Sequence, residues 1–268
     1  IPDDARLIGS VEDQKTDITY LFIYSSTAPN HGIWAYDRYG KLPGSSPNSI
    51  RLIYKSAQFN FPQNGFVKGD IVRTNASKTF GDLGVEFDKD ALIYFTDNKN
   101  EPRKVNAYRA IQAQSQIHGS DSFSEADFIT ACPKAPLDRI EFEFVNDESK
   151  SVSNFKTSGG FQFAYQNIYR DGMESAISVY SKVAFPPNIL DQGANQNIDL
   201  DFYNRCVLTI PQPGPEIKSV RLLARQGNLG YFFIIDEIEA DNFTPTYSFS
   251  NDRIVTGLSE NEVNKQFD

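Results

Sequence analysis

The feature that most constrains this chain is an alternation with a period of two, in which aromatic and β-branched residues recur at every other position. Short clusters of Gly, Asn, Asp and Pro interrupt the alternation, as turns interrupt strands. Successive side chains of a strand point to opposite faces, so this period is typical of strands. The sequence therefore predicts an all-β, antiparallel fold, with strands near residues 19–24, 33–36, 49–54, 69–73, 90–96, 103–108, 139–145, 161–169, 175–180, 206–210, 220–225, 231–238 and, more weakly, 253–256.

The alternation lapses between about residues 110 and 135, where Gln, Ser and Ala replace the aromatic residues. One short helix is expected there, with the hydroxyl of Ser124 capping its first turn. We therefore expect a first β domain over residues 1–127, a second over 136–242, and a connector or the start of a further β segment over 243–268. The roughly seven strands of the second domain fit an antiparallel sandwich of the immunoglobulin or fibronectin III type.

A tight hairpin is expected at Asp171-Gly172, between the strands near 161–169 and 175–180. Asp-Gly supplies the positive φ angles that a tight hairpin needs. A hairpin places its two strands face to face, so side chains that alternate in step share one face. The pattern predicts four inward-facing side chains, Phe163, Tyr165, Ile177 and Val179.

The charge balance is acidic, with 26 Lys and Arg against 35 Asp and Glu, a net charge of −9 among 268 residues. Residues 1–134 hold 15 basic and 16 acidic side chains, which gives −1, and residues 135–268 hold 11 and 19, which gives −8. Tight binding of nucleic acid by broad phosphate neutralisation needs a basic stripe, which this balance disfavours. No apolar run approaches the ~20 residues of a membrane span. Because the chain lacks an initiator Met, we expect it to be processed or part of a longer protein.

Groups that could carry catalysis are scarce. The two histidines, His31 and His118, lie in polar, loop-like sequence, and no Gly-x-Ser-x-Gly elbow accompanies them. Neither Cys132 nor Cys206 has a catalytic context; the two could form one disulfide, although isolated cysteines are more often small buried residues. Phosphate-binding glycine motifs are also missing from the sequence. We therefore expect no enzyme activity, no cofactor and no bound metal.

Carboxylate pairs could serve a glycosidase, since three of them have the i, i+2 spacing that places both acids on one strand face. Half-exposed strands show the same alternation, so solvated faces are the simpler interpretation. Calcium could bind at 97–101 or 236–241, yet neither segment matches the EF-hand loop pattern. The aromatic residues at 59–62 could stack on sugars or bases, but their spacing favours core packing. The three carboxylate pairs are Glu141/Glu143, Asp199/Asp201 and Glu237/Glu239.

Three stretches go beyond composition. Residues 92–106 read LIYFTDNKNEPRKVN, residues 163–178 read FAYQNIYRDGMESAIS, and residues 220–238 contain VRLLARQGN followed by FFIIDEI. Taken in this order, they resemble tail structural proteins of short-tailed bacteriophages, of the nozzle or tail-tube type. The resemblance covers roughly residues 17–245, with gaps.

That resemblance implies a β-propeller or propeller-like platform followed by an immunoglobulin-like domain. Only about two blade-like units are visible in residues 1–110, fewer than the ~4–8 of a closed propeller. The resemblance also implies a virion structural protein, a subunit of a tail assembly through which DNA passes. Expected partners are copies of the chain in a homo-oligomeric ring, built mainly through residues 1–130, and other tail proteins. The alternatives are a carbohydrate-binding or carbohydrate-cleaving β-protein at a cell surface and a receptor-type adhesion domain.

Two turns are the structural motifs that we single out. Asp97 can accept the backbone amides of its own turn, Pro102 fixes φ as the turn ends, and Arg103 or Lys104 can pair with acids of a neighbouring strand. The second turn is Asp171-Gly172. The turn at 97–103 is either a solvent-exposed connection or an assembly contact.

Overall fold

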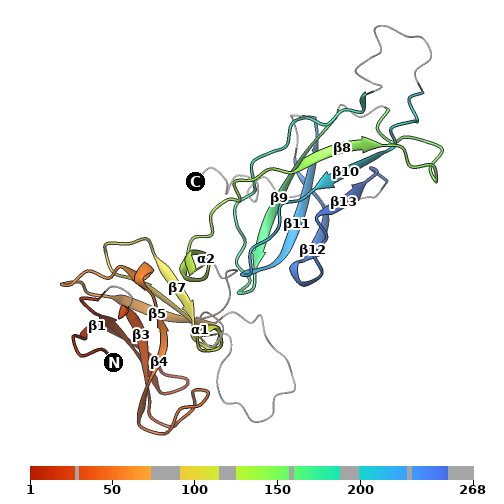
Figure 1. Cartoon of the computed structure of the whole chain (residues 1–268). Helices are drawn as coiled ribbons and strands as arrows, with labels where there is room; N and C mark the ends of the chain where they lie inside the picture. Colours follow the sequence, from red (N-terminus) through yellow and green to blue (C-terminus); the bar gives the residue numbers. More distant parts are fainter. Residues whose placement is uncertain are drawn as a thin grey trace. The chain divides into compact units, whose positions relative to one another are not determined.

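A computed structural model describes residues 1–27, 30–73, 91–114, 125–156, 160–187, 199–227 and 231–252. The chain divides into two compact units, Ile1–Cys132 and Pro133–Asp268. In Figure 1 the first unit runs from red to yellow and the second from green to blue. Each unit is built mainly of antiparallel sheets, and none of the four described sheets is closed. The predicted all-β, antiparallel class is therefore confirmed.

Unit 1 contains two sheets. A four-stranded meander has the order β1-β2-β3-β4, and a three-stranded one has the order β5-β6-β7. Two helices follow the last strand (Figure 1). The bounds are β1 Arg6–Asp13, β2 Ile18–Tyr24, β3 Gly32–Asp37, β4 Ser49–Lys55, β5 Lys68–Arg73, β6 Ala91–Thr96, β7 Arg103–Asn106, α1 Ala107–Gln114 and α2 Glu125–Ile129.

The two sheets of unit 1 meet where β1 approaches the segment that leads into β5. The Val67 amide donates to the Ile8 carbonyl at 2.8 Å. A Cβ atom at Gly9 would lie 2.3 Å from the Val67 carbonyl oxygen, so only glycine fits at this crossing. The core beneath contains a cluster of aromatic rings, in which Phe59 and Phe61 stack at 5.0 Å and are both buried. The core interpretation of these aromatics is thus confirmed.

Unit 2 is a sandwich of two three-stranded sheets, with orders β12-β11-β9 and β13-β10-β8. Side chains from both sheets form one apolar cluster, which includes Phe163, Leu208, Leu222 and Phe249. The bounds are β8 Glu141–Val145, β9 Phe161–Tyr169, β10 Arg205–Thr209, β11 Ile217–Gln226, β12 Phe233–Glu239 and β13 Thr246–Phe249.

The structure corrects the end of the strand predicted over 103–108. Strand β7 stops at Asn106, and Ala107 begins α1. The Asn106 side-chain oxygen accepts the Arg109 amide at 2.9 Å, which satisfies an amide of the first helical turn. Ala107 and Ala110 are buried against the core, so a capped helix replaces the final strand residues. The residue predicted to cap the next helix, Ser124, lies outside the described residues, and α2 begins at Glu125.

The strand predicted over 175–180 is also wrong, because residues 175–180 form no strand and their backbone amides pair with β9 only at every third residue. Phe163, Tyr165 and Ile177 are buried as expected, but Val179 is 51% exposed. The cause is a period of three rather than two along this segment, described below. Ile177 also joins a different cluster from Phe163, on the opposite side of β9.

Two strands were not anticipated. Strand β1 contains Gly9 and several charged residues, so its alternation is weak, and β13 has only four residues. The weak strand expected near 253–256 lies outside the described residues. Neither α1, with eight residues, nor α2, with five, could cross a membrane.

Candidate functional site

The turn between β6 and β7 is held by Asp97, as expected from its side chain. One carboxylate oxygen of Asp97 accepts the Lys99 and Asn100 amides at 3.0 and 2.8 Å. The other accepts the Asn100 side-chain amide at 2.5 Å. Asp97 is buried, so its charge is used to fix the backbone of its own turn.

The same turn packs against the segment after β4. The Asn100 side chain donates to the Phe59 carbonyl at 3.3 Å, and Lys99 Nζ donates to the Asn60 carbonyl at 3.1 Å. Buried Arg103 also donates from Nη1 to the Phe59 carbonyl, and burial lowers its pKa. We expected Arg103 to pair with a carboxylate of a neighbouring strand. Its described hydrogen bond goes instead to the backbone carbonyl of Phe59. Pro102 itself is exposed, and its carbonyl accepts the Ala131 amide at 3.2 Å.

The turn at Asp171-Gly172 closes the end of β9. Gly172 has a φ of 83°, and its amide donates to the Tyr169 carbonyl at 2.9 Å. The Asp171 carboxylate accepts the Met173 amide at 3.1 Å, and the Tyr169 amide donates to the Met173 carbonyl at 2.8 Å. Gly172 therefore supplies the positive φ expected of the turn, whereas Asp171 has no positive φ and acts through its carboxylate.

The segment that returns from this turn carries three serines, Ser175, Ser178 and Ser181, which we call the serine ladder. The amide of each serine donates to a carbonyl of β9, those of Asn167, Tyr165 and Phe163 respectively, at 2.8 to 2.9 Å. The amide of the same β9 residue donates back to the serine hydroxyl, at 2.9 to 3.0 Å. A hydroxyl thus takes the place of the carbonyl that a paired strand would offer.

The period of the ladder follows from this pairing. Three residues of the returning segment match two residues of β9, so every step contains one extra residue, as in a repeated β-bulge. Each hydroxyl also donates to the carbonyl of the next residue, at 2.7 to 3.1 Å. At the fourth step Ala184 has no hydroxyl, and its own carbonyl accepts the Phe161 amide at 3.0 Å. The segment covers the edge of β9 over its whole length.

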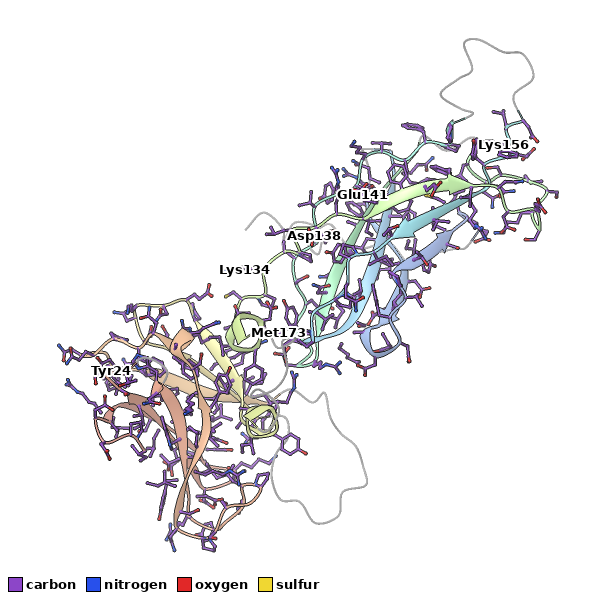
Figure 2. The ribbon with its side chains drawn as sticks, viewed as in Figure 1. Tyr24, Lys134, Asp138, Glu141, Lys156 and Met173 are labelled. Carbon is purple, nitrogen blue, oxygen red and sulfur yellow. The ribbon has the colours of Figure 1, made fainter. Side chains whose placement is uncertain are left out.

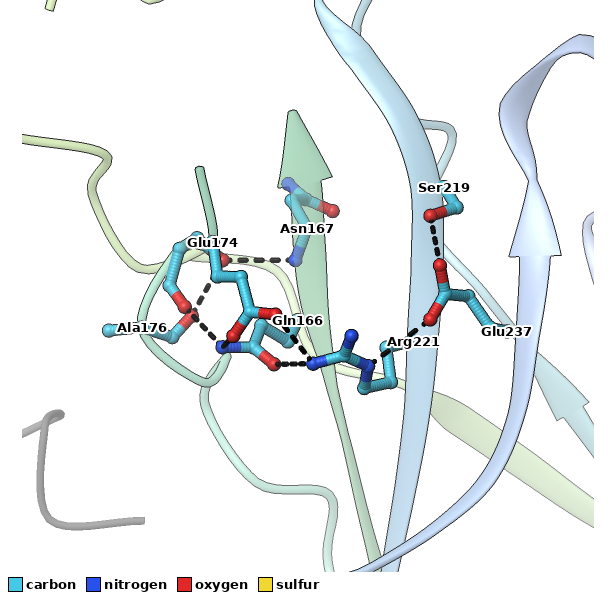
Figure 3. A network of polar contacts seen from close by, with 8 residues as sticks. Gln166, Asn167, Glu174, Ala176, Ser219, Arg221 and Glu237 are labelled. Carbon is cyan, nitrogen blue, oxygen red and sulfur yellow. Dashed lines mark hydrogen bonds and ion pairs between the residues drawn. The ribbon is translucent and has the colours of Figure 1, made fainter. Parts of the chain in front are cut away.

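A polar network lies beside the first rung of the ladder (Figure 3). Arg221 of β11 donates to Gln166 at 3.1 Å, to Glu174 at 3.0 Å and to Glu237 at 3.3 Å. Ser219 adds a bond to Glu237 at 2.6 Å. These side chains form a cross-strand row over β9, β11 and β12, in which one cation is matched by two carboxylates.

His31 is the only histidine among the described residues. Its ring is buried between Tyr24 and Phe61, with ring centroids 5.1 and 5.8 Å away. Its Nδ1 accepts the Ser25 amide at 3.4 Å. Burial lowers the pKa of His31, with a smaller contribution from Lys99. The imidazole therefore stays neutral and packs in the core.

Both cysteines are free thiols, and the single disulfide left open by the sequence is not formed. Cys132 is exposed, whereas Cys206 lies in the core of unit 2. Burial raises the pKa of Cys206 to about 12, so this thiol is unreactive while the sandwich is folded.

The carboxylate pairs do not converge on one site. Glu141 and Glu143 are exposed on β8, where Figure 2 labels Glu141. Asp201 accepts the Ser153 amide at 2.7 Å and pairs with Lys156 at 2.5 Å. Among the described residues, no three His, Cys, Asp or Glu side chains are grouped to hold a metal ion.

One pocket of about 200 Å³ lies in unit 2 between the edge strands β12 and β13. Its apolar lining includes Phe233, Ile235 and Tyr247. Two ion pairs lie in its wall, Lys150 with Asp252 at 2.7 Å and Arg205 with Asp147 at 3.6 Å. The pocket is smaller than the ~300 Å³ at which ligand sites usually begin.

No family model, curated protein or solved structure matches the chain.

Proposed function

We propose that the chain is a structural subunit of the tail of a short-tailed bacteriophage, of the nozzle or tail-tube type. The observation that carries the proposal is how the resemblance residues are used. In two of these stretches, named polar side chains bind backbone: Asp97 fixes its own turn, Arg103 binds the segment after β4, and Ser175 and Ser178 pair with β9. Residues with this role maintain a rigid shape, which suits an assembly protein.

For unit 2 we propose an immunoglobulin-like arrangement. The ladder segment, β9, β11 and β12 lie side by side in the order of strands C′, C, F and G of such domains. Strand β8 then corresponds to B and β10 to E, which pair in the opposite sheet, as β8 and β10 do here. Strand β13 extends that sheet beyond β10.

For unit 1 we propose a blade-like role for the meander β1-β2-β3-β4. Propeller blades are four-stranded antiparallel sheets with consecutive strands adjacent, and this order fits them. The second sheet has three strands among the described residues. We therefore propose that unit 1 is a propeller-like platform with an open sheet.

The charge of the chain suits a subunit beside which DNA passes. With a net charge of −9, the chain has no excess of basic side chains to neutralise DNA phosphates, so DNA would not be held during transit. We expect negligible affinity for duplex DNA at physiological salt, which a gel-shift titration would measure.

Immunogold electron microscopy tests the proposal directly. Particles are purified by density gradient from cultures that produce the chain and are labelled with an antibody against it. We expect gold on the tail, and the chain to be present in the particles by mass spectrometry. Purified particles that lack the chain, or gold on the cell surface instead, would refute the proposal.

Carbohydrate binding is the second candidate, and the pocket between β12 and β13 is the observation in its favour. Its aromatic and charged lining could accept a single sugar ring. A glycan array separates the two candidates, because a tail subunit predicts no specific binding. A Tyr247→Ala variant that abolishes a binding signal would assign it to this pocket.

A further inference from the structure

Arg205 of β10 differs from the other described arginines of unit 2, because its guanidinium donates no hydrogen bond to a described residue. Its Nε is buried without a partner, and its Nη1 lies 3.6 Å from the Asp147 carboxylate. Leaving a buried donor without a partner is unfavourable, so this group calls for an explanation. The other described arginines of the unit each donate at least one side-chain hydrogen bond: Arg139, Arg170, Arg221 and Arg225.

The Asp147 carboxylate is already used in its own turn. One of its oxygens accepts the Ser149 amide at 3.1 Å and the Ser149 hydroxyl at 2.6 Å. The Asp147 amide donates to the Asn204 side chain at 2.7 Å, which fixes the backbone of the same residue. The carboxylate is therefore held in place, at a distance from Arg205 that is too long for a hydrogen bond.

Arg205 lines the pocket between β12 and β13. At ~30 Å³ per water, the pocket's volume of about 200 Å³ corresponds to about six or seven waters, so it has room for a small molecule. Part of its lining is apolar, with Phe233, Ile235 and Phe249. Ligand pockets bind the body of a ligand by such apolar contacts and select it with a few polar groups.

Two cations line this pocket, and they differ in how they are satisfied. Lys150 pairs with Asp252 at 2.7 Å, which is a hydrogen-bonding distance. The Arg205 side chain is 35% exposed and keeps its donors unused by the described residues. Arg205 is therefore the group of the pocket wall that is best placed to bind an anion.

From these observations we propose that the pocket binds a small monocarboxylate with a short apolar body, and that Arg205 pairs with its carboxylate. A guanidinium can bind a carboxylate through two parallel N–H···O bonds, which would use donors that the described residues leave unused. The apolar body of the acid lies against Phe233 and Ile235. The inference goes beyond the tail proposal and does not depend on it.

The charges around the pocket limit the strength of this binding. The lining holds two cations, Lys150 and Arg205, and two carboxylates, Asp147 and Asp252, so its net charge is zero. Asp147 would lie close to the bound carboxylate, and like charges at short distance repel. For an acid of this size we therefore expect a dissociation constant on the order of 1 mM.

Ligand-observed NMR with the full chain tests the proposal, with isovalerate and isovaleramide as the probes. The two molecules have nearly the same shape, but only isovalerate is charged. We expect isovalerate to bind at least about tenfold more tightly, because its carboxylate forms charge-assisted hydrogen bonds with Arg205. Glucose is the third probe and should not bind in the same concentration range, since it has no carboxylate.

Three variants assign the binding to Arg205. Arg205→Gln should lower the affinity for isovalerate to that for isovaleramide and leave the affinity for isovaleramide unchanged. Asp147→Asn should tighten isovalerate binding by about threefold or more, since it removes the like charge and keeps the oxygen that accepts from Ser149. Arg139→Gln is the matched control, at an exposed arginine outside the pocket, and should change neither affinity. Protection of Cys206 from thiol reagents checks that each variant is folded.

Any of four results would overturn the inference. The first is a natural chain that binds no isovalerate up to about 30 mM. The second is equal affinity for isovalerate and isovaleramide, and the third is a folded Arg205→Gln variant that binds isovalerate as the natural chain does. The fourth is binding of glucose in place of the acid, which would leave the pocket to the sugar of the second candidate function. The tail proposal stands or fails separately, according to whether particles contain the chain.

Discussion

The hydroxyl of Ser178 accepts the Tyr165 amide at 3.0 Å, while the Ser178 amide donates to the Tyr165 carbonyl at 2.8 Å. One residue thus satisfies both polar groups of its partner on β9, and it does so in a fully buried position. Because the edge of β9 is sealed in this way, it offers no unpaired amides to other chains over these rungs.

Replacing Ser178 with Ala should destabilise unit 2 by about 1–3 kcal/mol, because the buried Tyr165 amide loses its acceptor. Chemical denaturation followed by circular dichroism measures the change. Val179→Ala, on the exposed neighbour, is the matched control and should change stability by less than about 0.5 kcal/mol. Equal effects of the two substitutions would contradict the role of the hydroxyl.

Stability should fall as the pH is lowered below the ordinary His31 pKa of 6.5. Burial lowers the pKa of the folded imidazole, so between that lowered pKa and 6.5 the unfolded chain binds the proton and the folded chain does not. The contribution of neutral His31 is complete above pH 6.5 and declines below it. Thermal melts between pH 7.5 and pH 5 should show this decline in stability. His31→Gln should remove the part of the decline that comes from His31. A variant whose stability depends on pH as in the natural chain would contradict a lowered His31 pKa.

Replacing both His31 and His118 with Gln should leave function and assembly nearly intact. His31 is buried between aromatic rings and has a packing role, and His118 lies outside the described residues. Particle incorporation of the double variant is the measurement. An activity that disappears while the variant stays folded would indicate that an imidazole does chemistry.

Thiol labelling should distinguish the two cysteines. Cys132 is exposed, whereas burial raises the Cys206 pKa to about 12. A thiol reagent at mildly alkaline pH should therefore modify one thiol of the folded chain rapidly and the second only on unfolding. Cys132→Ser should remove the rapid phase, and rapid labelling of both thiols in the folded chain would contradict the buried position of Cys206.

How far the sequence predicts this structure depends on whether the signal is local. The strand at residues 161–169 was predicted with its observed bounds, because alternating aromatics and a following Asp-Gly turn are local signals. The period of three at Ser175, Ser178 and Ser181 is visible in the sequence, but its meaning depends on which β9 amides the hydroxyls accept, and that pairing is not visible in the sequence. Similarly, the apolar run in β2 does not reveal which face is inward, since that depends on the register with β1 and β3.

From the sequence we expected the second domain to end at residue 242. Strand β13 lies beyond that point and pairs with β10 from Cys206↔Phe249 to Thr209↔Thr246. Phe249 is 7% exposed and contacts the rings of Phe161 and Phe163, with centroids 5.3 and 5.4 Å away.

A segment of residues 133–268 should therefore unfold cooperatively, with Cys206 protected from thiol reagents until it does. The segment 136–242 should be less stable by at least about 3 kcal/mol, the cost of removing one buried phenylalanine side chain. The loss is large relative to the ~5–15 kcal/mol total stability of a domain, so exposure of Cys206 should be evident. In the segment 133–268, Phe249→Ala removes the buried ring and keeps the strand pairing of β13. Because the loss of stability is attributed to the ring, this variant should reproduce most of it. Equal stability of the two segments would show that β13 adds nothing to the sandwich.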